Sequence, residues 1–211
     1  IMHMLKPLVA ASDSLPAVLL ALLVCQVLWF AGIHGTMIVT GIMNPFWLAN
    51  LAANQAALAA GQPIPHTFLP AFWDHFLFIG GVGSTLPLAF LLMRSRAVHL
   101  RTIARMGVVP GLFNINEPIM FGLPIVMNPM YVIPFILAPI VCNLIGYFCV
   151  CVIKIIPPVA YQVAWTTPGF LTTEEGKYAY KIINNATRYK TIHNIIMAMP
   201  FFLLLKTFSV I

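Results

Sequence analysis

The sequence predicts an all-α integral membrane protein that crosses the bilayer several times on helices, some of them broken or re-entrant. Hydrophobic residues make up 61% of the 211 residues, whereas Asp, Glu, Lys and Arg together make up 8%, against about 25% in an ordinary soluble domain. Between Leu15 and Met93 only Asp74 belongs to these four types, and this length suffices for two or three crossings of about 20 residues each. Prolines then recur through residues 110–139, which excludes one regular helix there.

Two apolar stretches precede the prolines, and each contains a break. Residues 15–43 are expected to form a membrane helix that is interrupted at the string GIHG (32–35), because glycine costs about 1 kcal/mol relative to alanine inside a helix. Residues 44–67 are less apolar, so we expect an amphipathic or interfacial helix followed by a turn. Residues 68–93 are apolar again but contain the run GGVGST (80–85). This run lacks the lysine of a phosphate-binding loop, and we interpret it as a helix break or a close helix contact.

The proline-rich stretch 110–139 is expected to be a broken or re-entrant segment. Its prolines stand at positions 110, 118, 124, 129, 134 and 139, and each removes a backbone donor and disfavours helical backbone before it. Glu117 is the only ionised side chain of the stretch, which argues against a plain solvated loop. Irregular backbone is tolerated in a membrane where it is buried in protein or lines a cavity, and transporters place substrate sites on such segments. Residues 140–156 are expected to continue as an apolar helix.

The net charge of +6 does not indicate nucleic-acid binding, because the cations do not cover one polar face. A cluster of cations lies in the segment 94–105, between apolar stretches, and consists of Arg94, Arg96, Arg101 and Arg105. This pattern is typical of a cytoplasmic loop under the positive-inside rule, and a surface for lipid headgroups or a partner is the alternative. The four cysteines lie within apolar runs and indicate neither a disulfide framework nor a metal site.

Glu117 is the strongest candidate for chemistry. A carboxylate at membrane depth is costly unless it is paired or hydrated, and it is therefore a functional candidate by default. Asn114 and Asn116 precede it, and Pro118 favours extended backbone at Glu117 itself. Amides donate and accept hydrogen bonds and a carboxylate accepts them, so this cluster suits a hydroxyl-rich solute, and the carboxylate could act as a general base. In the alternative interpretation, Glu117 caps a helix or pairs with an arginine of the segment 94–105.

His34, between Gly32 and Gly35, is the second candidate, although a histidine in a membrane helix can simply bind a backbone carbonyl. Trp29 and Trp165 offer flat apolar faces that can pack on a sugar ring. Tryptophans of an interfacial aromatic belt would occupy similar positions for a purely structural reason. The pair Asp74-His75 could handle protons, and it could equally pack against the basic segment or cap the glycine break.

Four strings of this sequence resemble one known family. They are WFAGIHG (29–35), FWDHFLFIGGVGSTLPL (72–88), GLFNINEPIMFGLPIVMNPMYVIPFILAP (111–139) and WTTPGF (165–170). They resemble the membrane subunit, enzyme IIC, of the bacterial phosphoenolpyruvate-dependent sugar phosphotransferase system, and within it the lactose/cellobiose/diacetylchitobiose family. The resemblance implies a multi-span helical transporter with broken or re-entrant helices around a buried sugar site.

The resemblance also implies a mechanism. The protein would phosphorylate a β-linked disaccharide of the cellobiose, diacetylchitobiose or lactose type while moving it across the bacterial inner membrane. Phosphate would pass to the sugar's 6-hydroxyl from a phosphocysteine of enzyme IIB, with enzyme IIA as an indirect partner of this chain, so no separate cofactor is implied. Glu117 matches the family's base, and His34 matches a residue that contacts the sugar near that hydroxyl. The expected sugar-binding residues are Trp29, Asn114, Asn116, Trp165, Gly35 and Ser84.

Only part of the family's length corresponds to this chain. Residues 1–171 are expected to be the C-terminal, sugar-binding half, and the chain starts at Ile1 rather than Met, so we expect it to be part of a longer polypeptide. The polar block 172–191 departs from the family's pattern, and residues 192–211 are expected to form a terminal apolar helix. The resemblance implies a homodimer that forms through the N-terminal half.

Two other functions stay open on the sequence alone. A proton-coupled secondary transporter would use Glu117 and His34 without phosphorylating its solute. An inactive membrane fragment would bind no sugar and would only pack against a partner, and the poor match of residues 172–191 to the family favours this alternative.

Overall fold

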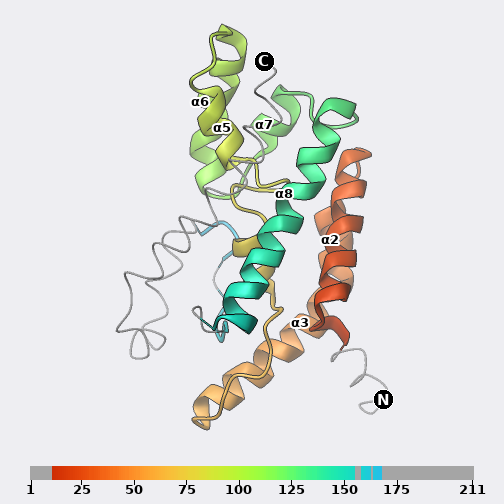
Figure 1. The fold of residues 1–211 in the computed structure, drawn as a ribbon, viewed down its shortest axis with the longest axis vertical. Helices are drawn as coiled ribbons and strands as arrows, with labels where there is room; N and C mark the ends of the chain where they lie inside the picture. The colour runs from red at the N-terminus through yellow and green to blue at the C-terminus, as the bar shows by residue number, and fades with distance from the viewer. Residues whose placement is uncertain (1–10, 155–157, 163, 168–211) are drawn as a thin grey trace.

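The structure, a computed structural model, describes residues 11–154, 158–162 and 164–167, and the described residues form helices and connecting turns without strands. The predicted polar block 172–191 and terminal helix 192–211 lie outside them. In chain order the helices are α2 (Leu15–Phe30), α3 (Gly35–Ala59), α4 (Pro70–Phe72), the π-helical turn η1 (Trp73–Leu77), α5 (Leu86–Leu92), α6 (Val98–Leu112), α7 (Glu117–Gly122), α8 (Pro129–Tyr147) and the π-helical turn η2 (Phe148–Val152) (Figure 1).

The helices α2 and α3 form a hairpin. The chain leaves α2 after Phe30 and turns through Gly32, whose φ is +83°, before α3 starts. Helix α3 then runs back along α2 and continues past the N-terminal end of α2 (Figure 1). We call this extension of α3 the arm. The predicted interruption is confirmed, but the expectation of one helix over 15–43 and a second over 44–67 is wrong, because α3 continues through Pro45.

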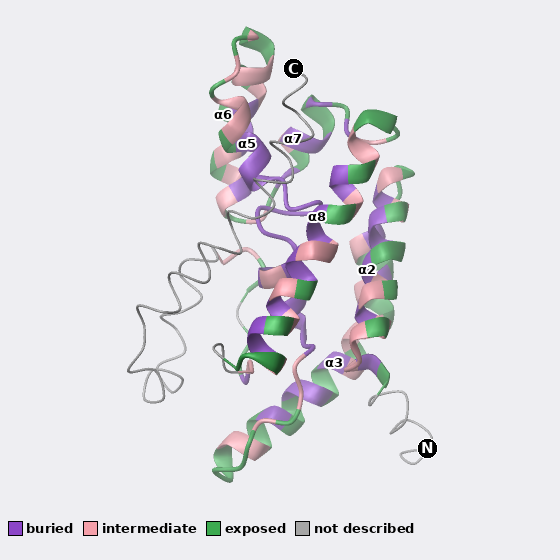
Figure 2. Ribbon diagram, in the orientation of Figure 1, coloured by how far each residue is buried: buried purple, intermediate pink, exposed green. Residues whose placement is uncertain are grey.

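A buried aromatic cluster joins α3 and α8 to the segment that contains α4 and η1. The ring centroids of Trp47 and Trp73 lie 5.1 Å apart, and those of Phe68 and Tyr147 lie 5.8 Å apart in a stacked arrangement. Phe72 contacts Phe68 edge-on. Figure 2 shows the corresponding run of buried backbone through the middle of the molecule. These large rings bury most of their surface, which fixes where the chain enters the glycine run.

The predicted break at GGVGST is confirmed. The chain between η1 and α5 is not helical, and Gly80, Gly81 and Gly83 all have positive φ, a conformation that glycine adopts without steric cost. Ser84 shares this conformation at φ +53°. The break therefore places a short irregular segment at the centre of the fold.

The proline-rich stretch is broken as predicted, but only in its first part. Turns separate α6, α7 and α8, and α8 then runs uninterrupted through Pro134 and Pro139. The expectation that the apolar helix starts near residue 140 is wrong, because a proline removes one backbone donor and can remain in a helix whose neighbours pack around it. Together α8 and η2 give Pro129–Val152, the one helix among the described residues that is long and apolar enough to cross a membrane, and α2 is apolar but shorter.

Only the first part of the basic segment 94–105 is a loop. The turn after α5 ends at Ala97, and α6 starts at Val98, so Arg101 and Arg105 belong to a helix. Arg94, Arg96 and Arg105 are exposed at the hairpin of α5 and α6 (Figure 2).

Candidate functional site

Two irregular segments meet at the centre of the molecule, and we call residues 80–85 together with residues 114–116 the crossing. Asn114 accepts a hydrogen bond from the backbone N–H of Gly80 at 3.1 Å. The side-chain amide of Asn116 donates to the carbonyl of Val82 at 2.6 Å and to the hydroxyl of Thr85 at 2.8 Å. The two asparagines predicted to bind sugar therefore also hold the two broken segments together.

The crossing is closely packed around Asn116, which is 5% exposed. A Cβ atom at Gly81 would lie 2.4 Å from the side chain of Asn116, so only glycine fits there. Thr85 donates its hydroxyl to the carbonyl of Gly80 at 3.1 Å, which closes the turn of the glycine run. Asn114 itself has a φ of +62°, a conformation that asparagine tolerates better than most residues.

Glu117 follows the crossing directly as the first residue of α7. Its side chain is exposed in the described chain, and its position at membrane depth stays a prediction. Among the residues that the structure describes, the ion pair is that of His66 with Asp13, and Glu117 is not paired with an arginine. The alternative in which an arginine neutralises Glu117 is thus not observed. The crossing holds the backbone immediately before Glu117. The side chain of Glu117 is exposed.

Trp165 lies next to the crossing. Its backbone carbonyl accepts a hydrogen bond from the side-chain amide of Asn114 at 2.7 Å, and 53% of the residue is exposed. The structure therefore brings together four of the predicted site residues: Asn114, Asn116, Glu117 and Trp165. An exposed indole can offer a stacking face, and an exposed carboxylate can offer a hydrogen-bond acceptor.

Three other candidates, Trp29, His34 and Gly35, lie at the turn between α2 and α3, which we call the His34 turn (residues 29–36). His34 precedes the first residue of α3, and its Nδ1 accepts the backbone N–H of Met37 at 3.3 Å. The rings of Trp29 and His34 lie 4.3 Å apart, and the indole Nε1 donates to the hydroxyl of Thr36 at 2.8 Å. His34 is exposed, whereas Trp29 is 7% exposed. The buried ring of Trp29 therefore packs against the exposed imidazole of His34.

The turn that follows α7 connects these two groups of residues. The backbone N–H of Met127 donates to the carbonyl of Phe30 at 3.0 Å, and a Cβ atom at Gly32 would contact Val126 at 3.6 Å. The chain from Glu117 to Met127 thus reaches from the crossing to the His34 turn. The two ends of this connection carry the exposed carboxylate and the exposed imidazole.

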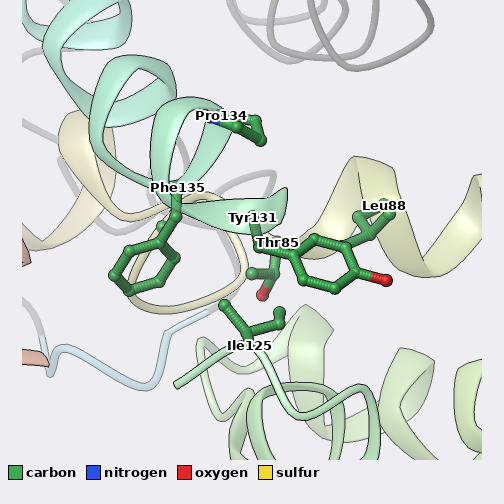
Figure 3. Close-up of a pocket in the computed structure, with 7 residues that line it drawn as sticks. Thr85, Leu88, Ile125, Tyr131, Pro134 and Phe135 are labelled. Carbon is green, nitrogen blue, oxygen red and sulfur yellow. The ribbon is translucent and has the colours of Figure 1, made fainter. Parts of the chain in front are cut away.

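A small pocket of about 20 Å³ lies between the glycine run, α5, α8 and the turn after α7. Figure 3 shows Tyr131 and Phe135 of α8 facing Thr85, with Ile125 closing one side. Its lining is mainly apolar, and none of the eight predicted site residues is part of it. In the described part of the chain no cluster of His, Cys, Asp and Glu could hold a metal ion.

The family model of the phosphotransferase system EIIC component matches residues 1–139 of this chain. The chain belongs to the EIIC family. The sequence-based assignment to this family is confirmed. This match includes the His34 turn and the crossing, so the geometry above describes an EIIC protein.

Curated EIIC relatives carry the names of several sugar systems. The oligo-β-mannoside-specific EIIC component of Bacillus subtilis is 38% identical over 169 residues, which cover 78% of this chain and 38% of that protein. The cellobiose-specific EIIC component of Geobacillus stearothermophilus is 40% identical over 175 residues, covering 80% and 39%. The lactose-specific EIICB component of Lacticaseibacillus casei is 36% identical, covering 80% and 29%. The chain thus spans about two fifths or less of the length of these relatives.

A solved structure shows the same fold. The crystal structure of the transporter ChbC, the IIC component from the N,N'-diacetylchitobiose-specific phosphotransferase system, matches with a TM-score of 0.85 and 34% identity. The match covers 97% of this chain and 46% of that one. The predicted fold class, an all-helical membrane transporter with broken helices, is confirmed.

Two predicted site residues of this EIIC chain have contacts that explain their identity without a ligand. A Cβ atom at Gly35 would lie 2.2 Å from the backbone oxygen of Cys25, so glycine lets α3 approach α2. Ser84 is fully buried, and its hydroxyl donates to the carbonyl of Leu77 at 2.8 Å. The structure therefore gives both residues packing roles, and their contact with sugar stays a prediction.

Sequence reasoning missed three residues that support the site: Thr36, Gly81 and Thr85. A weak signal for Thr85 was present, because a hydroxyl residue after a glycine run can close the turn through its side chain. Thr36 and Gly81 have no such signal. Their importance comes from Trp29 and Asn116, which approach them only in the folded chain.

Proposed function

We propose that residues 1–171 are the sugar-binding half of a phosphotransferase permease that binds a β-linked disaccharide and presents its 6-hydroxyl for phosphorylation. One observation carries the proposal. The crossing fixes the backbone beside Glu117 through buried hydrogen bonds of Asn114 and Asn116, while the carboxylate itself is exposed and pairs with no described cation. A fixed and unpaired carboxylate is suited to accept a hydrogen bond, and then a proton, from a bound hydroxyl.

The chemical step requires few parts from this chain. The carboxylate of Glu117 accepts the proton of the 6-hydroxyl as that oxygen attacks the phosphorus atom of the phosphocysteine on enzyme IIB. The bond between phosphorus and sulfur breaks, the thiolate leaves with enzyme IIB, and the sugar phosphate forms. His34 would contact the sugar near the same hydroxyl, and Trp165 would stack on a ring. Most of the catalytic effect would come from holding the hydroxyl in line with the donor.

The substrate class, location and partners follow from the same proposal. Relatives named for cellobiose, lactose and diacetylchitobiose support a β-linked disaccharide. The exposed arginines of the α5–α6 hairpin support a cytoplasmic position for that end, from which phosphorylated enzyme IIB could reach Glu117. The remaining half of the family's length would supply the homodimer scaffold in the bacterial inner membrane.

Direct detection of sugar phosphate tests the function. Membranes that contain this chain would be mixed with phosphorylated enzyme IIB and radiolabelled cellobiose, diacetylchitobiose or lactose, and the products would be separated by charge. We expect labelled sugar phosphate for one of the three sugars. A parallel reaction with unphosphorylated enzyme IIB controls for endogenous kinases.

Two outcomes would contradict the proposal. Accumulation of unmodified sugar that an uncoupler abolishes would indicate a proton-coupled transporter. Absence of both sugar phosphate and sugar binding, measured by equilibrium dialysis in detergent, would indicate an inactive fragment.

A further inference from the structure

We propose that Asn54, on the arm of α3, is a positioning residue that places Trp165 beside the crossing. The part of this inference that concerns sugar rests on the proposed function. Asn54 is not among the predicted site residues, and it contacts no part of the crossing directly. It acts on the described residues 158–162 and 164–167, which include Trp165.

The side chain of Asn54 is fully buried and uses both of its functional groups. Its amide nitrogen donates to the carbonyl of His66 at 2.8 Å and to the carbonyl of Val159 at 2.8 Å. Its oxygen accepts the backbone N–H of His66 at 3.0 Å. One amide thus ties α3 to two other segments, of which one is 105 residues away in sequence. Buried polar groups that are satisfied in this way fix a specific arrangement.

A second anchor holds the other end of the same segment. The carbonyl of Trp165 accepts the side-chain amide of Asn114 at 2.7 Å, and the backbone N–H of Thr167 donates to Ala164 at 2.8 Å. The segment is therefore held by Asn54 at Val159 and by Asn114 at Trp165. Trp165 is 53% exposed, so packing alone does not fix it, and the two anchors hold the backbone that carries its indole.

The Asn54 anchor is itself attached to α2. The carboxylate of Asp13 accepts the backbone N–H groups of Thr67 at 3.0 Å and Phe68 at 2.7 Å, and it lies 2.9 Å from Nδ1 of His66. His66 is the residue whose backbone Asn54 holds on both sides. Val159 is thus connected to a part of the protein that the Asp13 contacts make rigid, and a change at Asn54 would release Val159 without removing Asp13.

Hydrogen exchange tests the inference without any sugar. The full chain in detergent would be compared as wild type, as Asn54→Ala and as Asn50→Ala.

Asn50 is a matched control, because it is equally buried one helical turn earlier and its amide bonds to Ser12 rather than to residues 158–167. We expect amide exchange in the peptide that contains Thr167, whose N–H donates to the carbonyl of Ala164, to increase about tenfold in Asn54→Ala, since the anchoring bonds are lost. The same peptide should exchange at the wild-type rate in Asn50→Ala. Unchanged exchange in Asn54→Ala, or an equal increase in both variants, would overturn the proposal.

A double-mutant cycle then tests the consequence for sugar. We expect Asn54→Ala to raise KM for the disaccharide about three- to tenfold with little change in kcat, and to have no further effect in a Trp165→Ala background, because residues that act through one another are not additive. Additive effects would show that Asn54 is merely structural and would overturn the inference. If wild-type chain binds no disaccharide while the exchange result is as expected, the proposed function fails and the positioning of Trp165 by Asn54 stands.

Discussion

The crossing and the His34 turn are both breaks between helices, and both carry predicted site residues, but different bonds hold them. In the crossing, Asn114 and Asn116 bind backbone and hydroxyl groups that are 31 to 34 residues away. In the His34 turn, the bonds of Trp29 and His34 reach only seven and three residues along the chain. The crossing is buried around Asn116, whereas His34 is exposed.

This difference predicts which residues of the site contribute mainly to the stability of the fold and which contribute mainly to its chemistry. A break that is held by distant, buried partners exists only when the whole fold exists, so a change there should destabilise the protein. In the His34 turn the side-chain bonds are local, and the distant bond is the backbone contact of Met127 with Phe30, so a side-chain change at its surface should leave the fold intact. Glu117 belongs to neither class, because its backbone follows the crossing while its side chain is exposed.

Replacing Glu117 by glutamine should give the largest effect and would show that the crossing serves chemistry. We expect the rate of sugar phosphorylation to fall about 10²- to 10⁴-fold, because a glutamine amide cannot accept the proton of the hydroxyl. Disaccharide binding should be largely retained, since the amide has nearly the shape of the carboxylate. Single-turnover transfer from phosphorylated enzyme IIB measures the rate, and equilibrium dialysis measures the binding.

The thermal midpoint of Glu117→Gln serves as the control. It should match that of the wild type, because the described structure shows no hydrogen bond or ion pair of this side chain that the change would remove. A variant that transfers phosphate at the wild-type rate would exclude Glu117 from the mechanism.

Replacing Asn116 by alanine should give the largest loss of stability. The acceptors at Val82 and Thr85 would both lose their donor, and each buried unsatisfied group costs about 1–3 kcal/mol, so we expect the free energy of unfolding to fall by about 2–4 kcal/mol. Unfolding in detergent, followed by tryptophan fluorescence, measures it.

Asn128→Ala is the matched control for Asn116→Ala. Asn128 caps α8 locally through the N–H of Met130 at 3.1 Å, so its loss should cost only about 1 kcal/mol. Equal losses for the two variants would contradict the view that distant partners stabilise the crossing more than local ones stabilise a cap.

The sequence revealed the breaks of this fold better than the helices between them. Glycine signals its own conformation, and the positive φ values at Gly32 and Gly80 lie where the strings GIHG and GGVGST predicted a break. Proline is a weaker indicator of a helix break, because its energetic cost depends on the residues that pack around it. Pro45 and Pro134, for example, lie inside continuous helices. The helix bounds near residues 44 and 140 were wrong for this reason.

The site could be predicted as a set of residues but not as a geometry. The polar strings identified Asn114, Asn116 and Glu117, and the structure joins the two asparagines to the glycine run. The exposure of Glu117 could not be derived, because burial depends on which distant segments cover a residue. Asn54 gave no signal either, since its partner Val159 comes close only in the folded chain.

Truncating the exposed side chains that face the proposed sugar should have a moderate effect. We expect His34→Ala and Trp165→Ala each to weaken disaccharide binding about two- to tenfold, as loss of one aromatic contact costs about 0.5–1.5 kcal/mol. Binding isotherms in detergent measure the change. Unchanged isotherms for both variants would show that neither side chain binds sugar. His34 would then serve only as a helix cap, and Trp165 would be an ordinary surface residue.

Replacing Thr36 by valine should give the smallest effect and sharpens the difference between the two breaks. The indole Nε1 of Trp29 would lose its acceptor, and we expect the free energy of unfolding to fall by about 1 kcal/mol. Thr40→Val is the control one turn later on α3, because the hydroxyl of Thr40 only bonds the carbonyl of Thr36 within the same helix, at 2.7 Å, and its loss should change stability by much less. Since the bond between Trp29 and Thr36 is local, Thr36→Val should also leave amide exchange in residues 80–85 unchanged. Faster exchange there would show that the two breaks are coupled and would remove the distinction between them.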